Sequence, residues 1–268
     1  MSMSKNPEMN LRKALAMVAE AASKGANVVC LPELFSVRYF PQHRDSEVEP
    51  AKTPNPVTAA LAAAAKDHRV VLIGGSIYER AGVKSFNTSF VFSENGKILG
   101  KYRKVHLPQD PCFYEQSYFE SGDAYRVFET TYGRIAVLIC FDQWYPEAAR
   151  AVKLMGADIL LYPTAIGTVR GVAQTEGNWQ DAWESVQRGH AISNSLVVGA
   201  ANRVGVEGSL TFWGGSFVFD QFGRRVGHAG RSEQVVMARC DLGLAEEVEA
   251  GWGFLRNRRP DTYSRLVD

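Results

Sequence analysis

The spacing of apolar residues along the chain predicts helices that alternate with short strands. Residues 7–24 carry apolar side chains from Leu11 to Ala22 at intervals of three and four, which places them on one face of a helix. Asn6 precedes this stretch and Gly25 follows it, and these residue types favour the first and last turns of helices. We expect three further helices, near residues 56–67, 146–155 and 179–194.

Runs of β-branched and aromatic residues predict the strands. We expect hairpins around Asn95-Gly96, near Gly133 and around Gly223, because alternating segments flank these turn residues. The remaining strands are expected at residues 26–31, 69–79, 134–140, 157–163, 196–201 and 233–242. The tail beyond residue 251 is basic and aromatic without strong periodicity. Since no repeat or linker divides residues 1–268, we expect one layered α/β domain with a mixed sheet or two sheets.

Composition excludes several classes of function. Thirty basic and 29 acidic residues give a formal net charge of +1, which argues against nucleic acid or an anionic membrane as a partner. No apolar run approaches the ~20 residues of a membrane span, and the amino end lacks the apolar segment of a secretory signal. Four scattered cysteines without a C-x-x-C pair favour a reducing, cytoplasmic setting. Five dispersed histidines argue against a metal site, and no phosphate- or dinucleotide-binding motif is present.

Cys140 is the cysteine best placed for chemistry. It ends the strand expected at residues 134–140, and Pro146 marks a helix start six residues later. A thiol near a helix N-terminus is stabilised as the thiolate. Cysteine is nevertheless among the most buried residue types, so this segment alone favours core packing over a nucleophile. Pairing of Cys140 with His106 or His190 stays open at this point.

Two further reactive residues also follow expected strands. Glu33 lies in the otherwise apolar segment "CLPELF", where a buried carboxylate needs a hydrogen-bond or ionic partner. Lys104 ends the second strand of the hairpin that turns at Asn95-Gly96. An ion pair at a sheet edge would explain either residue alone. Together with Cys140, however, they place a carboxylate, an ammonium and a thiol at strand ends, where ligand sites of open α/β sheets gather.

The segments around these residues resemble signature blocks of a known family. "LPELF", "KYRKVHLP" and "CFDQWYPEAARAVKLMGADILLYPTAIG" are similar to the three blocks of the nitrilase, or carbon–nitrogen hydrolase, superfamily. Within it, "DPCFYEQSYFESGD", "DQWYPEAAR", "YPTAIG" and "QRGHAISN" most resemble the N-carbamoylputrescine amidase branch. The resemblance runs from about residue 6 into the tail. It implies a four-layer αββα sandwich with mixed sheets, assembled as a homodimer or larger homo-oligomer.

The resemblance also implies a role for each matching residue. Glu33 corresponds to the family's general base, Lys104 to its oxyanion-stabilising lysine and Cys140 to its nucleophile. Glu115 in "FYEQ" corresponds to a second glutamate that positions the lysine and the substrate. Tyr39 in "RYFPQ" lies where that branch has a tyrosine beside the substrate.

The chemistry of amide hydrolysis accounts for these residue types. A carboxylate takes the thiol proton, a lysine and the backbone N–H of Phe141 stabilise the oxyanion, and no metal or organic cofactor is required. Asp142 is expected to cap the turn after the nucleophile, while Trp144 lines the pocket or packs in the core. The expected reaction is hydrolysis of a small carbamoyl or amide substrate, first of all N-carbamoylputrescine. Alternatives are an N-carbamoyl-amino-acid or β-ureidopropionate amidohydrolase, an ω-amidase, and a catalytically silent binding or scaffold protein.

Several positions depart from the pattern of the family. Its members usually open with a strand ahead of the first helix, and that strand is expected to be missing here. Cys112 and Gln116 replace residues common in the lysine block. The helix near residues 179–194 and the segment before it carry three acidic residues that either neutralise an amine tail or form a solvated face: Glu176, Asp181 and Glu184. His190 and Asn202-Arg203 are expected to be framework polar groups, and residues 251–268 are expected at a subunit interface.

Overall fold

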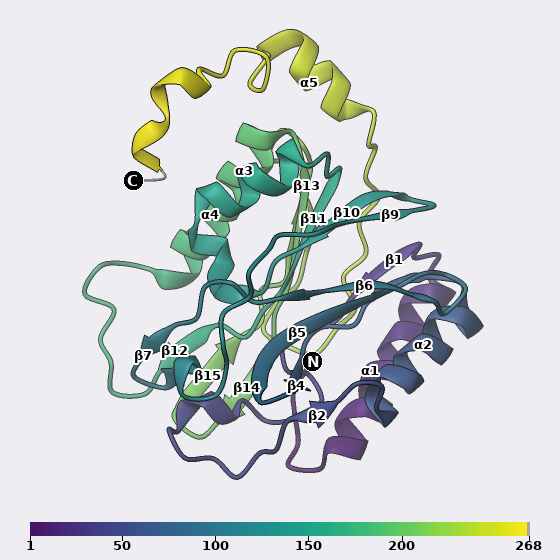
Figure 1. The fold of residues 1–268 in the computed structure, drawn as a ribbon, viewed down its shortest axis with the longest axis vertical. Helices are drawn as coiled ribbons and strands as arrows, with labels where there is room; N and C mark the ends of the chain where they lie inside the picture. The colour runs from purple at the N-terminus through teal and green to yellow at the C-terminus, as the bar shows by residue number, and fades with distance from the viewer. Residues whose placement is uncertain (267–268) are drawn as a thin grey trace.

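The computed structural model describes residues 1–266 and shows two β-sheets packed between two pairs of helices (Figure 1). Helices α1 (Pro7–Ser23) and α2 (Pro56–His68) cover the outer face of the first sheet. Helices α3 (Pro146–Leu154) and α4 (Trp179–Asn194) lie side by side over the second sheet. The predicted four-layer αββα sandwich with mixed sheets is therefore confirmed.

The first sheet is built around its longest strand, β5. Strands β3 and β4 pair with different parts of one edge of β5, and β6 pairs with its other edge. Strand β1 pairs with β3, and β2 pairs with β4. The bounds are β1 Val28–Cys30, β2 Ala51–Lys52, β3 Val71–Ile73, β4 Ile77–Ala81, β5 Lys84–Phe92 and β6 Ile98–Arg103.

The second sheet has the order β17-β16-β13-β11-β10-β9. Its three central strands, β10, β11 and β13, run parallel, and the outer pairs are antiparallel. The bounds are β9 Val127–Thr130, β10 Gly133–Val137, β11 Ile159–Pro163, β13 Val197–Ala201, β16 Phe217–Phe219 and β17 Arg225–His228. The helices and hairpins expected from the sequence lie within a few residues of these positions.

The apolar runs of the central strands are explained by burial on both faces. Val71 and Ile73 of β3 belong to the core shared with the second sheet, whereas Leu72 between them packs under α1 and α2. Successive side chains of a strand point to opposite faces. A strand between a helix layer and another sheet therefore needs a continuous apolar run rather than alternation.

Three parts of the structure differ from the sequence predictions. The strand expected at residues 69–79 is divided into β3 and β4, because Gly75 adopts a positive φ of 58°. The polar stretch near residue 167 and the residues after β13 form an unexpected three-stranded sheet. Its strands are β12 (Gly167–Val169), β14 (Val204–Glu207) and β15 (Leu210–Trp213).

An unexpected helix, α5 (Leu244–Trp252), precedes the tail. A two-stranded sheet, β7 (Gln109–Asp110) with β8 (Phe113–Tyr114), completes the strands of residues 1–266.

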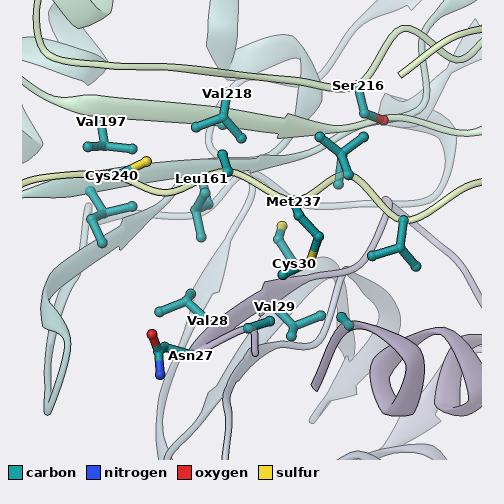
Figure 2. Close-up of a pocket in the computed structure, with 18 of the residues that line it drawn as sticks. Asn27, Val28, Val29, Cys30, Leu161, Val197, Ser216, Val218, Met237 and Cys240 are labelled. Carbon is teal, nitrogen blue, oxygen red and sulfur yellow. The ribbon is translucent and has the colours of Figure 1, made fainter. Parts of the chain in front are cut away.

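The last predicted strand, at residues 233–242, is also wrong. This segment has no strand assignment, and with β1 it lines a cavity of about 1020 Å³ (Figure 2). Within residues 1–266, β1 pairs only with β3, so its other edge carries no strand. The sequence pattern of residues 233–242 suits a strand, but a strand also needs a hydrogen-bonded neighbour. The expectation that a family strand ahead of α1 is missing stays a prediction.

Gly75 offers a test of how tightly the first sheet is packed against the segment that leads to Glu33. A Cβ at this position would lie 2.2 Å from the carbonyl oxygen of Pro32, whereas a Cβ at Gly82 would meet nothing within 4 Å. Both glycines have positive φ. We expect Gly75→Ala to lower the free energy of unfolding by about 2–4 kcal/mol and Gly82→Ala by about 1 kcal/mol. Urea denaturation measures both, and equal losses would contradict the close approach.

Candidate active site

The three reactive residues predicted at strand ends are brought together where the two sheets meet. Glu33 follows β1 through Leu31 and Pro32, and Lys104 directly follows β6. Cys140 begins a short 3₁₀ helix, Cys140–Trp144, three residues after β10 ends. Each therefore projects from the carboxyl end of a strand, as expected for ligand sites in α/β folds. Glu33 and Lys104 have no exposed surface, and Cys140 is 8% exposed.

Lys104 is the centre of the polar network. Its Nζ donates to Oε1 of Glu33 at 2.9 Å and to both carboxylate oxygens of Glu115 at 2.8 and 2.7 Å. Glu115 opens the 3₁₀ helix Glu115–Ser117 and is fully buried. Burial alone lowers the pKa of Lys104, but the charges of Glu115 and Glu33 raise it above its ordinary value. Lys104 is therefore a permanent ammonium held between two carboxyl groups.

The two oxygens of the Glu33 carboxylate have different surroundings. Oε1 accepts from Lys104 and from the side-chain amide of Asn87 at 2.8 Å. Oε2 is buried and has no hydrogen-bond partner within residues 1–266. Unpartnered buried carboxylate oxygens are rare in folded proteins, and they occur where a substrate or water completes the site. One oxygen of Glu33 is thus fixed and the other is available to receive a proton.

Burial and neighbouring charges shift the pKa of Glu115. Burial raises its pKa to about 7, although the Lys104 ammonium opposes this, and the nearby Glu33 charge raises the pKa further. The Tyr39 hydroxyl donates to Oε1 of Glu115 at 2.7 Å and favours the ionised form. Two carboxylates that share one lysine cannot both be stabilised fully as anions.

Cys140 lies beside this network as a thiol rather than a thiolate. Burial raises its pKa well above the ordinary value, and the charge of Glu33 adds to this, while Lys104 acts in the opposite direction. Its Sγ is 3.8 Å from the carbonyl oxygen of Ala165. The expected help from a helix N-terminus is small, because α3 begins only at Pro146. A thiol in this state would need a neighbouring base to act as a nucleophile.

The turn that presents Cys140 is held by Asp142. Cys140 has a φ of +44°, a strained conformation for a residue with a side chain. The Asp142 carboxylate accepts from the backbone N–H of Ile139 at 2.8 Å and from the Tyr102 hydroxyl at 2.8 Å. It also accepts from the backbone N–H of His106 at 2.9 Å. The predicted capping role of Asp142 agrees with these contacts.

The two histidines considered as partners for the thiol make other contacts. Nδ1 of His106 is 2.7 Å from Oδ1 of Asp142, and the imidazole ring stacks on the ring of Tyr145 with 3.6 Å between the ring centroids. Nε2 of His190 is 2.8 Å from the carbonyl oxygen of Gln143. These contacts favour Glu33 over a histidine as the base for Cys140.

The other predicted site residues divide into two groups. Tyr39 is fully buried and joins the network through Glu115, and burial together with the Glu115 charge raises the pKa of its phenol well above the ordinary value. Phe141 is half-buried, and its ring packs against Tyr145 at 5.8 Å. Trp144 is half-buried and packs against the main core, so packing describes it better than pocket lining.

Sequence reasoning missed Asn87, which holds Glu33 from β5. The residue is fully buried, and its backbone carbonyl also accepts from the Lys104 N–H at 2.9 Å. Its signal was an asparagine within the strand "SFNTSFVF", a residue type that is depleted in strands. A buried polar residue in such a place indicates a required hydrogen bond.

The acidic residues on and before α4 make surface contacts. Glu176 is exposed and accepts from the indole of Trp179 at 3.2 Å. Glu184 forms an ion pair with Arg225 at 2.9 Å, and Asp181 is exposed. Of the two interpretations left open, these contacts favour the solvated face. In residues 1–266, no three His, Cys, Asp or Glu side chains gather in a way that could hold a metal ion.

Most of the chain matches a known protein family. The family model "Carbon-nitrogen hydrolase" matches residues 1–250. The chain is 39% identical to an N-carbamoylputrescine amidase of Arabidopsis thaliana, over 96% of this chain and 90% of that protein. It is 36% identical to a citrullinase of Francisella tularensis, over 100% of this chain and 96% of that protein.

A solved structure shows the same fold. The crystal structure of a carbon–nitrogen hydrolase from Helicobacter pylori superposes with a TM-score of 0.92 at 38% identity, covering 100% of this chain and 96% of that one. The family match spans most of the chain, and both relatives are well above 30% identical. The chain therefore belongs to the carbon–nitrogen hydrolase family of the nitrilase superfamily.

Proposed function

We propose that this amide hydrolase uses Cys140 as its nucleophile and Glu33 as its general base. The observation that carries this proposal is the free Oε2 of Glu33 in a buried network beside a neutral thiol. Glu33 takes the thiol proton as Sγ attacks the carbonyl carbon of the substrate. The negative charge then moves to the carbonyl oxygen, where Lys104 and the backbone N–H of Phe141 stabilise it.

The second half of the reaction uses the same base. Glu33 returns its proton to the leaving nitrogen, ammonia departs, and the acyl or carbamoyl group stays on Cys140. Glu33 next takes a proton from water, whose oxygen attacks this group and releases the thiol. Glu115 stays in place and balances part of the lysine charge, which keeps Lys104 oriented throughout.

For the substrate, we propose a linear ureido compound, with N-carbamoylputrescine as the leading candidate. Similarity to an N-carbamoylputrescine amidase and to a citrullinase supports this class, because both named substrates end in a ureido group. Hydrolysis of the carbamoyl group on Cys140 would release a carbamic acid, which loses carbon dioxide. The products would then be putrescine, carbon dioxide and ammonia, which would make the reaction a step of polyamine biosynthesis. An N-carbamoyl-amino-acid or β-ureidopropionate hydrolase and an ω-amidase are the enzyme alternatives.

A panel of substrates tests the reaction and the nucleophile together. We expect N-carbamoylputrescine to yield equal amounts of ammonia and carbon dioxide, whereas an ω-amide would yield ammonia alone. Cys140→Ala should lower turnover by about 10³-fold or more, because no other group can form the covalent intermediate. Cys240→Ala, which changes a half-buried cysteine of the cavity beside β1, is the matched control.

Two results would contradict the proposal. Equal turnover of anionic β-ureidopropionate would reject the polyamine substrate. No ammonia from any ureido or amide compound, together with an unreactive Cys140, would favour the silent binding protein.

The pKa of Glu115 predicts the acid side of the pH profile. We expect kcat/KM to fall below about pH 7, because protonation of Glu115 removes one of the two charges that hold Lys104. Tyr39→Phe removes a hydrogen bond that favours the Glu115 carboxylate, so the pKa should rise. The acid limb should then move up by about one pH unit. The measurement is kcat/KM at each pH, from substrate concentrations below and above KM. An acid limb at the same pH in Tyr39→Phe would show that Tyr39 does not control the protonation of Glu115.

We further propose that residues 1–268 form one domain that assembles as a homodimer or larger oligomer through its tail, about residues 251–268. Figure 1 shows α5 and the tail arching away from the sheets, past α3. Trp252 is 61% exposed although it contacts Phe222 and Phe254. An oligomer interface that covers this indole would explain why so large an apolar side chain is exposed. Val267 and Asp268 lie outside the described residues.

Light scattering tests this assembly. The unaltered chain should have at least twice the monomer mass of 29.6 kDa, and Trp252→Glu should shift it towards monomer. Val83→Glu changes a 92% exposed valine in the turn between β4 and β5 and should have no effect. A monomer at all concentrations would contradict the proposal.

We also place the enzyme in the cytoplasm. All four cysteines are free thiols, which suits a reducing compartment. No helix among residues 1–266 is long and apolar enough to span a membrane.

A further inference from the structure

The segment between Glu33 and Tyr39 has little regular structure, yet it is buried next to the nucleophile. Residues 34–36, 39 and 40 are all buried. A buried loop must satisfy its backbone polar groups by other means, because no helix or sheet ladder does so. The hydrogen bonds of this segment therefore show what fixes its shape.

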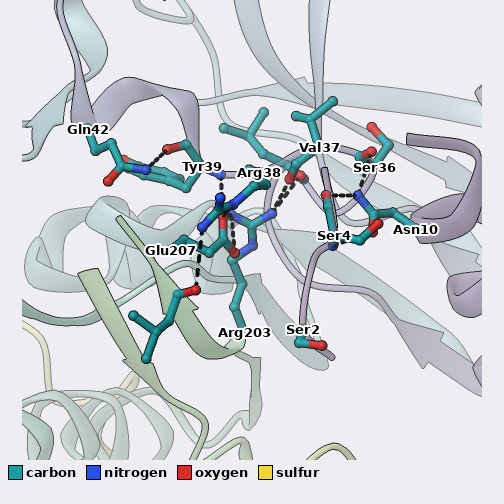
Figure 3. A network of polar contacts seen from close by, with 12 residues as sticks. Ser2, Ser4, Asn10, Ser36, Val37, Arg38, Tyr39, Gln42, Arg203 and Glu207 are labelled. Atoms are coloured by element: carbon teal, nitrogen blue, oxygen red, sulfur yellow. Dashed lines mark hydrogen bonds and ion pairs between the residues drawn. The ribbon is translucent and has the colours of Figure 1, made fainter. Parts of the chain in front are cut away.

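Side chains from distant parts of the chain supply most of these bonds. Ser76 accepts from the N–H of Leu34 at 2.9 Å. Asn10 of α1 donates to the carbonyl of Ser36 at 3.1 Å (Figure 3). Arg203 and Glu207 supply the other bonds from distant side chains. One further bond, from the Val37 N–H to the Leu34 carbonyl, lies within the segment.

Arg203 and Glu207 hold the two ends of the segment. Arg203 lies just before β14, has no exposed surface, and donates through Nη2 to the carbonyls of Leu34, at 3.0 Å, and of Val37. Glu207 ends β14 and accepts from the backbone N–H of Tyr39 at 2.7 Å (Figure 3). The two side chains form an ion pair, with Nη1 3.4 Å from Oε1.

These contacts close a ring through the catalytic network. Going around it, Glu33 contacts Lys104, Lys104 contacts Glu115, and Glu115 accepts from the hydroxyl of Tyr39. The segment itself joins Tyr39 back to Glu33. A change in its shape that moves either end therefore alters the distance between Glu33 and Tyr39, and with it the hydrogen bonds of the carboxyl groups on Lys104.

We propose that Arg203 and Glu207 are positioning residues of the active site, which set the relative placement of Glu33 and Tyr39 through the segment between them. The proposal rests on the function proposed for Glu33 and goes beyond the framework role expected for Arg203. Arginine suits this position because Nη2 contacts the two carbonyls while Nη1 faces Glu207. A lysine would have one nitrogen for all three partners.

The test is Glu207→Gln, which keeps the shape and an oxygen for Tyr39 N–H but removes the charge opposite Arg203. We expect kcat/KM to fall about 10- to 100-fold, mainly through kcat, because small displacements of catalytic groups have effects of this size. The matched control is Asp220→Asn. Asp220 is also buried, pairs with Arg224 at 2.5 Å, and accepts from backbone N–H groups, but it lies in the β16–β17 hairpin.

Two further readouts separate positioning from general loss of stability. The pH profile of Cys140 alkylation by chloroacetamide, followed by mass spectrometry of the Cys140 peptide, needs no substrate. We expect this profile to shift in Glu207→Gln and to stay unchanged in Asp220→Asn. In a double-mutant cycle with Tyr39→Phe, the losses in kcat/KM should be less than additive, because both changes act on the same link to Glu115.

The outcomes decide the proposal in either direction. The proposal is wrong if circular dichroism shows that Glu207→Gln is folded and the variant has the same kcat/KM and the same pH profile of Cys140 alkylation as the unaltered enzyme. It is also wrong if the control loses as much activity. Should Glu207→Gln fail to fold, Arg203→Lys is judged by the same criteria. If the unaltered enzyme hydrolyses no amide or ureido compound, the proposed function fails, while the alkylation profiles still decide this inference.

Discussion

The site depends on one buried lysine shared between two carboxyl groups. An ammonium without exposed surface is costly unless anions compensate it, and here Glu33 and Glu115 do so at 2.7–2.9 Å. The two carboxyl groups are less fully compensated, since within residues 1–266 Oε2 of Glu33 has no hydrogen-bond partner and the pKa of Glu115 is raised to about 7. Removal of Lys104 would leave two buried carboxyl groups without their shared cation, and removal of either carboxyl group would take away hydrogen bonds that orient the ammonium, so the surrounding structure must hold all three.

Residues of both sheets and of distant loops hold these three groups in place. Glu33 and Lys104 follow strands of the first sheet, and Cys140 follows a strand of the second. Asn87 fixes Glu33 from within β5, and Asp142 fixes the strained turn at Cys140. The packed interface between the sheets therefore sets the distance from thiol to base. The small third sheet contributes in turn, through the side chains that hold the segment from Leu34 to Tyr39.

Burial also decides how the nucleophile is activated. A thiol that is 8% exposed, next to the charge of Glu33, is held in its neutral form. In the proposed mechanism, activation therefore accompanies the attack, with proton transfer to Oε2 of Glu33, rather than preceding it. The same dry environment would strengthen the proposed interaction of Lys104 with a developing oxyanion, because the effective dielectric constant is low. Low reactivity at rest and strong stabilisation of the oxyanion have a common physical cause.

Local sequence determined the elements and the identities of the reactive residues. The helix from Pro7 to Ser23, the hairpin at Asn95-Gly96 and the turn at Cys140 follow from short-range pattern and turn chemistry. Glu33 could be selected as a carboxylate within an apolar segment after a strand, Lys104 as the end of a hairpin strand, and Cys140 as the end of a β-branched run ahead of a helix start. The likeness to a family then supplied the roles and the αββα layers.

Tertiary structure decided everything that depends on neighbours distant in the chain. The segment at residues 233–242 has the pattern of a strand, but it lines a cavity beside β1 without pairing. Asn87, Arg203 and Glu207 act through contacts with residues 54 to 169 positions away, which no local pattern reports. The protonation of Cys140 was also open in the sequence, because it depends on the balance of burial and nearby charge. Periodicity describes which face of an element is buried, and only the packed structure shows what lies against it.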